Sequence, residues 1–257
     1  MRKSYDHCIM VLTSPRSDGV DYLDETIASL EAAGAREFDR IIYSDGEIAS
    51  CRWSHFEGWK RVQHTHGPSG SLLGTLRAFN FFLNGTSAET LLFFEDDILA
   101  CRNLIEKMAS TVIPEDDAFA SFFDCNDFVV APHEGDLCFK PGFHRFLCNG
   151  RKANGFWHTQ ALLLPRRSVR WFVDSHIFGE IQGLVDQGKP LPNIDISMGE
   201  AFMKSPFKTY LRHYPSLVEH IGDVSRLGFE NIRRASGFVG VECDAMSLGK
   251  EIHDGTR

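Results

Sequence analysis

The sequence lacks the features that would place the chain in a membrane. It contains no run of about 18 apolar residues, the length that a transmembrane helix requires. The apolar run near its start, residues 8–12, is too short for the core of a signal peptide, and no small-residue cleavage site follows it. We therefore expect a protein without a membrane span that is located in the cytoplasm.

Cysteine is present but scattered. The chain has seven cysteines, an odd number, and no two of them form a C-x-x-C pair. Zinc sites usually require closely spaced cysteines, and disulfide frameworks usually require an even number. We therefore expect reduced thiols, with neither a structural zinc site nor a set of disulfides.

Positive charge is in deficit, because 27 Lys and Arg residues stand against 35 Asp and Glu residues, for a net charge of −8. This balance disfavours broad attraction to nucleic acid, although a local basic groove remains compatible with it. The 257 residues are 43% hydrophobic, which is typical of a globular protein with a substantial core.

Apolar runs alternate with helical periodicities along the first half of the chain. Strands are predicted at 8–12, 41–43 and 91–94, and helices at 22–33 and 72–83. This order predicts an α/β fold with a mixed, mostly parallel sheet flanked by helices in a single domain. Further elements are predicted later in the chain, with strands at 119–123 and 161–165 and helices at 103–110, 169–177 and 195–203. No regular pattern marks 47–71, 132–160 or the segment after 240.

Three adjacent acids follow a run of four large apolar residues. Leu91 to Phe94 read as a strand buried on both faces, and Glu95, Asp96 and Asp97 come directly after it. Three carboxylates cannot stay inside a buried strand, because an isolated buried charge is costly to desolvate. We therefore place them at the carboxyl end of the strand, where α/β sheets bind ligands, and expect them to hold a divalent metal and a diphosphate. The alternative is a solvated acidic turn.

Two earlier loops are candidates for nucleotide binding. Asp45 ends the second predicted strand, where its carboxylate would accept a hydrogen bond from a base, although Asp-Gly is also an ordinary turn. Thr13 and Arg16 follow the first strand, and Arg16 would pair with a phosphate, although this stretch is otherwise only a polar loop. We add Arg77, on the predicted helix at 72–83, to the nucleotide-binding residues.

Three residues in the second half are candidates for metal binding and proton transfer. His220 would complete the coordination of Mn²⁺ more readily than that of Mg²⁺, and the alternative is a histidine of the core. Asp195 and Glu200 are candidate general bases for an acceptor hydroxyl. Their alternative role is that of acids near a helix N-terminus, stabilised by the helix dipole. The loop from Lys140 to Trp157 is basic and aromatic, so it would either stack an acceptor or form an ordinary surface loop.

Taken together, these motifs resemble the GT-A-fold glycosyltransferases that use nucleotide sugars. The Glu95-Asp96-Asp97 triplet resembles their DxD-type motif, and it stands after the strand and nucleotide loop at Thr13 to Arg16 and the Ser44-Asp45-Gly46 turn. The segment Pro215 to Leu227, which reads PSLVEHIGDVSRL, resembles the P-S-L-x-x-H-x-G-x-x-S-x-L segment of the branching N-acetylglucosaminyltransferase IV family, whose members carry an EDD triplet.

The resemblance implies a role for most of the candidate residues. It makes Asp97 the direct metal ligand, His220 the second protein ligand to Mn²⁺ (or Mg²⁺), and Asp45 the residue that reads uracil. It places Glu95 and Asp96 near the donor sugar and the ribose. It also places Gly155 and Phe156 beside the donor sugar and requires a base on the acceptor side, for which Asp195 is the first choice and Glu200 the second. Independently of the resemblance, we expect the segment 225–237, which begins at Ser225, to close as a lid over the diphosphate.

The expected activity is therefore metal-dependent, inverting transfer of a sugar from a UDP-sugar to an acceptor hydroxyl, with a saccharide as the preferred acceptor. Alternatives are a phage-type glycosyltransferase of hydroxymethylated DNA bases, a nucleotidyltransferase, and a sugar-binding domain without catalysis. The expected organisation is one glycosyltransferase domain at 1–240, with a nucleotide-binding half at 8–130, an acceptor-binding half and lid at 131–240, and a tail at 241–257.

Overall fold

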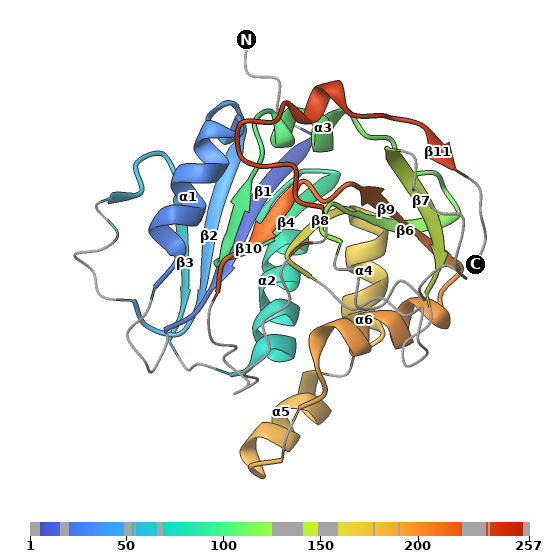
Figure 1. The fold of residues 1–257 in the computed structure, drawn as a ribbon. Coiled ribbons are helices and arrows are strands. Elements are labelled where there is room, and N and C mark those ends of the chain that lie inside the picture. Colours follow the sequence, from blue (N-terminus) through green and yellow to red (C-terminus); the bar gives the residue numbers. More distant parts are fainter. Residues whose placement is uncertain are drawn as a thin grey trace.

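A large sheet with helices on both faces forms the body of the protein (Figure 1). The computed structural model describes residues 6–15, 21–48, 53, 55–65, 69–124, 141–148, 159–176, 178–189, 191–222, 235 and 237–253. The fold is α/β with a mixed, mostly parallel sheet, which confirms the predicted fold class. In this part of the chain no helix has the length and apolar character needed to cross a membrane.

Among the described residues, the main sheet has nine strands in the order β11-β7-β9-β6-β8-β4-β1-β2-β3. Its strands are β1 (His7–Thr13), β2 (Asp39–Asp45), β3 (Lys60–His64), β4 (Thr90–Glu95), β6 (Asp117–Ser121), β7 (Gly142–Leu147), β8 (Ala161–Pro165), β9 (Thr209–Tyr214) and β11 (Ile252–His253). A separate two-stranded sheet joins β5 (Ile98–Ala100) to β10 (Val218–His220).

Strand directions bring several carboxyl ends to one edge of the sheet. Strands β4, β1, β2 and β3 are mutually parallel. Strand β8 runs antiparallel to both β4 and β6, and β9 is parallel to β6, so β6 and β9 run in the same direction as β4. The residues that follow these strands therefore lie at the same edge, which is the edge where α/β sheets bind ligands.

Helices cover both faces of this sheet. They are α1 (Leu23–Ala32), α2 (Ser71–Gly85), α3 (Leu104–Ser110), α4 (Arg166–Asp174), α5 (Phe178–Asp186) and α6 (Ile194–Met203), with short 3₁₀ helices η1 (Ala35–Glu37) and η4 (Ala245–Ser247). Helices α1 and α3 pack into one apolar cluster, and α2, α4 and α6 pack into the other. Helix α5 projects away from the sheet (Figure 1).

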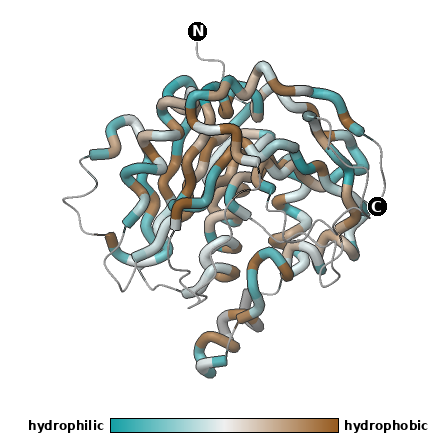
Figure 2. The backbone as a smooth tube through the Cα atoms, in the orientation of Figure 1, coloured by the Kyte–Doolittle hydropathy of each residue, from teal (hydrophilic) through white to brown (hydrophobic). Residues whose placement is uncertain are grey.

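Burial on both faces explains the apolar runs of the central strands. In β1, Ile9 and Val11 belong to the cluster with α1, and Cys8 and Met10 belong to the cluster with α2. A strand with this alternation must be apolar throughout, and Figure 2 shows hydrophobic residues concentrated in the central strands. The first helix ends at Ala32, one residue before the predicted end, and Gly34 beyond it adopts a left-handed φ of 106° that favours glycine.

Several described elements have no predicted counterpart or lie shifted from the prediction. Strands β5, β9 and β10 were not predicted, and α4 begins and ends three residues before the helix predicted at 169–177. Strand β3 lies in the segment 47–71, and β7 lies in the segment 132–160, both without a predicted element. Helix α5 was not predicted either, and β6 begins and ends two residues before the strand predicted at 119–123. Residues after 240 also join the fold, since β11 pairs with β7.

Candidate functional site

The acidic triplet lies where β4 ends. Glu95 is the last residue of the strand, and Asp96 and Asp97 form the connection to β5. Both aspartates are nearly buried, with exposed fractions of 9% and 8%. The carboxylates therefore stand at the carboxyl edge of the sheet, as the sequence predicts, but they are too enclosed for a freely solvated acidic turn.

Residues from β1 and α1 fix the middle acid. The hydroxyl of Thr13 donates a hydrogen bond of 2.6 Å to Oδ2 of Asp96. The buried hydroxyl of Thr26 donates to the Asp96 carbonyl at 2.9 Å and accepts from the backbone N–H of Ile98 at 3.0 Å. Thr13 thus positions Asp96 directly, and contact between Thr13 and a nucleotide stays a prediction.

Thr159 and Gln160, the two residues that precede β8, hold the carboxylate of Glu95. The Thr159 hydroxyl and the Gln160 side-chain amide both donate to the Glu95 carboxylate, the latter at 3.2 Å. Burial of this carboxyl group, followed by the negative charge of Asp97, raises the pKa of Glu95 to about 7. Thr159 and Gln160 could not be identified from the sequence, because both lie in the segment 132–160 without a regular pattern.

The third acid meets the histidine that the sequence analysis singled out. Strand β10 pairs antiparallel with β5, so His220 lies opposite Ile98 and beside Asp97. Nε2 of His220 is 3.1 Å from Oδ2 of Asp97, although 123 residues separate the two in sequence. The backbone N–H of Ile221 donates to the Asp97 carbonyl at 2.8 Å and fixes the pair.

The distance between these two atoms is compatible with a shared metal. Adjacent ligand atoms around an octahedral cation with bonds of about 2.1 Å lie about 3.0 Å apart, close to the 3.1 Å between Nε2 of His220 and Oδ2 of Asp97. Within the described ranges, no group of three or more His, Cys, Asp or Glu side chains is arranged to hold a metal.

Asp45 lies at the end of β2 inside a polar cluster with the start of α2. Its carboxylate accepts from the backbone N–H and the hydroxyl of Ser69, each at 2.8 Å, and from Nη1 of Arg77 at 3.4 Å. The same Arg77 nitrogen lies 3.3 Å from Nδ1 of His64, at the end of β3. His64 therefore belongs to this cluster, although nothing in the local sequence indicates it.

The candidate bases lie on α6. Asp195 is in the first turn, where its carboxylate accepts from the backbone N–H of Ile196 at 2.7 Å. Leu191, in the connection to α6, lies beside the start of α2. A Cβ added at Gly70 would be 3.9 Å from Cδ1 of this leucine. Asp195 therefore lies toward the carboxyl edge of the sheet. Glu200 is five residues farther along the helix and, at about 1.5 Å per residue, lies about 7.5 Å farther from that end.

Several predicted residues lie outside the described part of the chain. They are Arg16, Gly155, Phe156 and Ser225, together with most of the lid at 225–237 and most of the loop from Lys140 to Trp157. Their roles stay predictions.

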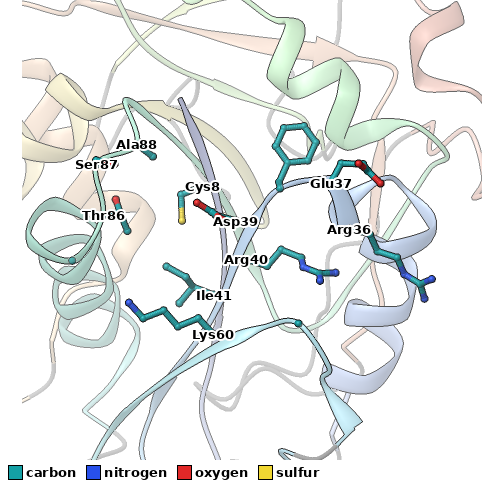
Figure 3. A pocket seen from close by; sticks show the side chains of 13 residues that line it. Cys8, Arg36, Glu37, Asp39, Arg40, Ile41, Lys60, Thr86, Ser87 and Ala88 are labelled. Carbon is teal, nitrogen blue, oxygen red and sulfur yellow. The ribbon is translucent and has the colours of Figure 1, made fainter. Parts of the chain in front are cut away.

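A cavity of about 550 Å³ lies at the opposite edge of the sheet, at the amino ends of β1, β2 and β3 (Figure 3). Its lining includes Cys8, Asp39, Arg40 and Lys60. Arg40 is already paired with Glu31 at 3.2 Å. None of the predicted site residues that the structure describes lines this cavity, so the described part of the candidate site and the cavity are separate features.

No protein-family model and no curated protein sequence matches the chain. Solved structures with a similar arrangement include an active-site mutant of LgtC, with TM-score 0.49 and 12% identity over 85% of this chain and 88% of that one. A glycosyltransferase GlyE from Streptococcus pneumoniae TIGR4 has TM-score 0.46 and 10% identity over 79% of this chain and 44% of that one. TarS from S. aureus in complex with UDP has TM-score 0.31 and 18% identity over 41% and 31%. At these values, the likenesses assign neither a family nor an activity to the chain.

Proposed function

We propose that this protein is a GT-A-type glycosyltransferase that moves a sugar from a UDP-sugar to an acceptor hydroxyl with the help of a divalent metal, in the cytoplasm. The observation that carries the proposal is the convergence of Asp97 and His220. Two residues separated by 123 positions place a carboxylate and an imidazole 3.1 Å apart at the carboxyl edge of the sheet. Neither a solvated acidic turn nor a histidine of the core would require these two side chains to lie in contact.

The polar cluster at the end of β2 is suited to the nucleotide. A carboxylate has about four lone-pair positions, and the contacts from Ser69 and Arg77 to Asp45 use three of them. The remaining position would accept the N–H of uracil. Arg77 adds a positive charge beside this position for the rest of the nucleotide.

The triplet and His220 are suited to the diphosphate and the donor sugar. Asp97 and His220 would hold Mn²⁺ or Mg²⁺, and Asp96, oriented by Thr13, would face the ribose. When bound, the cation neutralises negative charge on the leaving diphosphate. Glu95, held by Thr159 and Gln160, would contact the donor sugar.

The proposed reaction is a single in-line displacement. The acceptor oxygen forms a bond to the anomeric carbon of the sugar while the bond from that carbon to the diphosphate oxygen breaks. The acceptor proton passes to Asp195, and UDP leaves. Because there is a single in-line displacement, the anomeric configuration inverts. The position of Asp195 in the first turn of α6, toward the carboxyl edge, favours it over Glu200.

The decisive experiment is a panel of UDP-sugars incubated with the protein and Mn²⁺, with UDP release measured in the absence of an acceptor. We expect slow hydrolysis of one donor, loss of that activity in Asp97→Asn, and retention in Asp116→Asn, a change at an exposed aspartate. Pyrophosphate release from a nucleoside triphosphate would instead indicate a nucleotidyltransferase. Sugar binding without turnover of any donor would indicate a binding domain.

The acceptor is then identified with the active donor. We expect a saccharide, because the net charge of −8 opposes binding to a polyanion. Salt-sensitive binding to duplex DNA would favour the DNA-modifying alternative.

A further inference from the structure

Gly222 approaches the atoms proposed to bind the metal. It follows His220 by two residues, just after β10. A Cβ atom at Gly222 would lie 2.5 Å from Oδ2 of Asp97 and 3.2 Å from Nε2 of His220. The first distance is well below van der Waals contact, so any side chain at this position would overlap the carboxylate.

The backbone at this position does not itself require glycine. The described glycines with positive φ include Gly34 and Gly237, and Gly222 is not among them. A residue with ordinary φ loses nothing in backbone conformation by carrying a Cβ. The reason for glycine at 222 is therefore the space beside Asp97 and His220.

We propose that Gly222 is a positioning residue of the metal site, which keeps open the side of the Asp97–His220 pair where a divalent cation and diphosphate oxygens coordinate. The inference rests on the proposed metal-dependent function. A hard cation needs about six ligands, and two protein atoms supply only part of them. Water and phosphate oxygens must reach the cation past the two ligand side chains, and a methyl group at 222 would occupy that approach.

Asp97 has little freedom to move away from such a methyl group. Its carbonyl is bonded to the backbone N–H of Ile221, the residue before Gly222. The carboxylate would have to rotate instead, and rotation would move Oδ2 away from its place 3.1 Å from Nε2 of His220. Loss of the shared geometry would weaken metal binding even if the fold persisted.

The test measures Mn²⁺ binding by electron paramagnetic resonance in the presence of UDP, for the unaltered protein, Gly222→Ala and Gly183→Ala. Gly183 lies in α5, where the nearest atom to an added Cβ is 4.0 Å away, so it serves as the matched control. We expect Mn²⁺ affinity about 10- to 100-fold lower in Gly222→Ala and unchanged in Gly183→Ala. Thermal unfolding of each variant shows whether the fold is retained.

The outcomes separate this inference from the proposed function. Equal Mn²⁺ affinity in the unaltered protein and Gly222→Ala would overturn the role of Gly222 alone. Failure of the unaltered protein to bind Mn²⁺ with UDP would overturn both the metal site and the role of Gly222. If Gly222→Ala does not fold, folding is measured for the double variant Asp97→Ala/Gly222→Ala, which lacks the carboxylate that the alanine would overlap. Recovery of folding in the double variant would support the overlap between a side chain at 222 and the Asp97 carboxylate. Continued failure to fold would contradict that overlap.

Discussion

Gly74 offers a prediction in which packing at the candidate site opposes helix propensity. It is the fourth residue of α2, and its N–H donates to the Gly70 carbonyl at 2.9 Å. Its φ is not positive, so the helix itself would accept alanine. A Cβ at Gly74, however, would lie 2.9 Å from Oδ2 and 3.1 Å from Cγ of Asp45. The helix and the carboxylate therefore compete for this space.

The size of the effect follows from two opposing contributions. Alanine is favoured over glycine inside a helix by about 1 kcal/mol. Overpacking of a buried site costs about 1–3 kcal/mol. We expect Gly74→Ala to lower the free energy of unfolding by up to about 2 kcal/mol, and Gly183→Ala, where the nearest atom is 4.0 Å away, to raise it by up to about 1 kcal/mol. Urea unfolding of both variants measures the difference.

A second readout links this packing to nucleotide binding. Displacement of the Asp45 carboxylate should weaken binding of UDP to Gly74→Ala, as measured by calorimetry, and leave Gly183→Ala unchanged. Asp45→Ala/Gly74→Ala should recover the helix-propensity gain, because the overlap is removed. Gly74→Ala that stabilises the protein as much as Gly183→Ala and binds UDP normally would show that a side chain at position 74 does not overlap the Asp45 carboxylate.

Three further predictions concern the triplet and a buried lysine. Asp97→Asn should lose Mn²⁺-dependent UDP release by at least about tenfold while Asp116→Asn keeps it, and equal rates in both would contradict the metal role. Thr13→Val removes a 2.6 Å hydrogen bond to Asp96 and should lower the free energy of urea unfolding by about 1.5–3 kcal/mol; no change would show that this bond is not stabilising. Burial lowers the pKa of Lys107 from 10.5 to about 8. The folded chain therefore loses this proton at a lower pH than the unfolded chain does. As a result, the Lys107 contribution to the free energy of unfolding should increase as the pH rises from about 8 to about 10.5. Lys107→Met should lack that contribution in urea unfolding across the same pH range, and an identical pH dependence in the variant would contradict it.

The central strands were predictable because burial on both faces leaves a continuous apolar run. Strands β1 and β4 meet this condition, and their neighbouring helices carry a clear apolar face. Strand β3 could not be recognised in this way, because it is the last strand of the sheet and its residues are exposed or only half-buried. Its sequence, Lys60 to His64, contains a single apolar residue, so it offers no hydrophobic periodicity.

Strand β7 was missed for another reason. Its polar residues have partners that come from distant parts of the chain. Arg145 pairs with the buried carboxylate of Asp117, and His144 packs against His253 with ring centroids 5.0 Å apart. Such partners make a polar strand stable, but they leave no trace in the local sequence. The local sequence of β7 therefore shows no pattern that would indicate a strand.

The same limit applies to the site. Its acids could be placed from the sequence, because carboxylates after a buried apolar run must lie at the end of a strand. Their supporting residues could not, because Thr159 reaches Glu95 across 64 positions and Thr26 reaches the Asp96 carbonyl across 70. The pairing of Asp97 with His220 was implied by the family resemblance, and it is the β5–β10 pairing that brings the two side chains together.

The two ends of the candidate site share one structural feature, since a glycine backbone packs against a carboxylate at each. Gly74 lies against Asp45, and Gly222 lies against Asp97, and neither glycine has a positive φ. The two glycines come from opposite layers, because α2 belongs to one apolar cluster and β10 to the other. Under the proposed function, a UDP-sugar would therefore extend along the carboxyl edge from the layer of α2, at its uracil, to the layer of β10, at its diphosphate. Alanine at position 74 should then lower the affinity for UDP measured in the absence of Mn²⁺. Alanine at position 222 should leave that affinity unchanged and reduce only the increase in UDP affinity that Mn²⁺ causes.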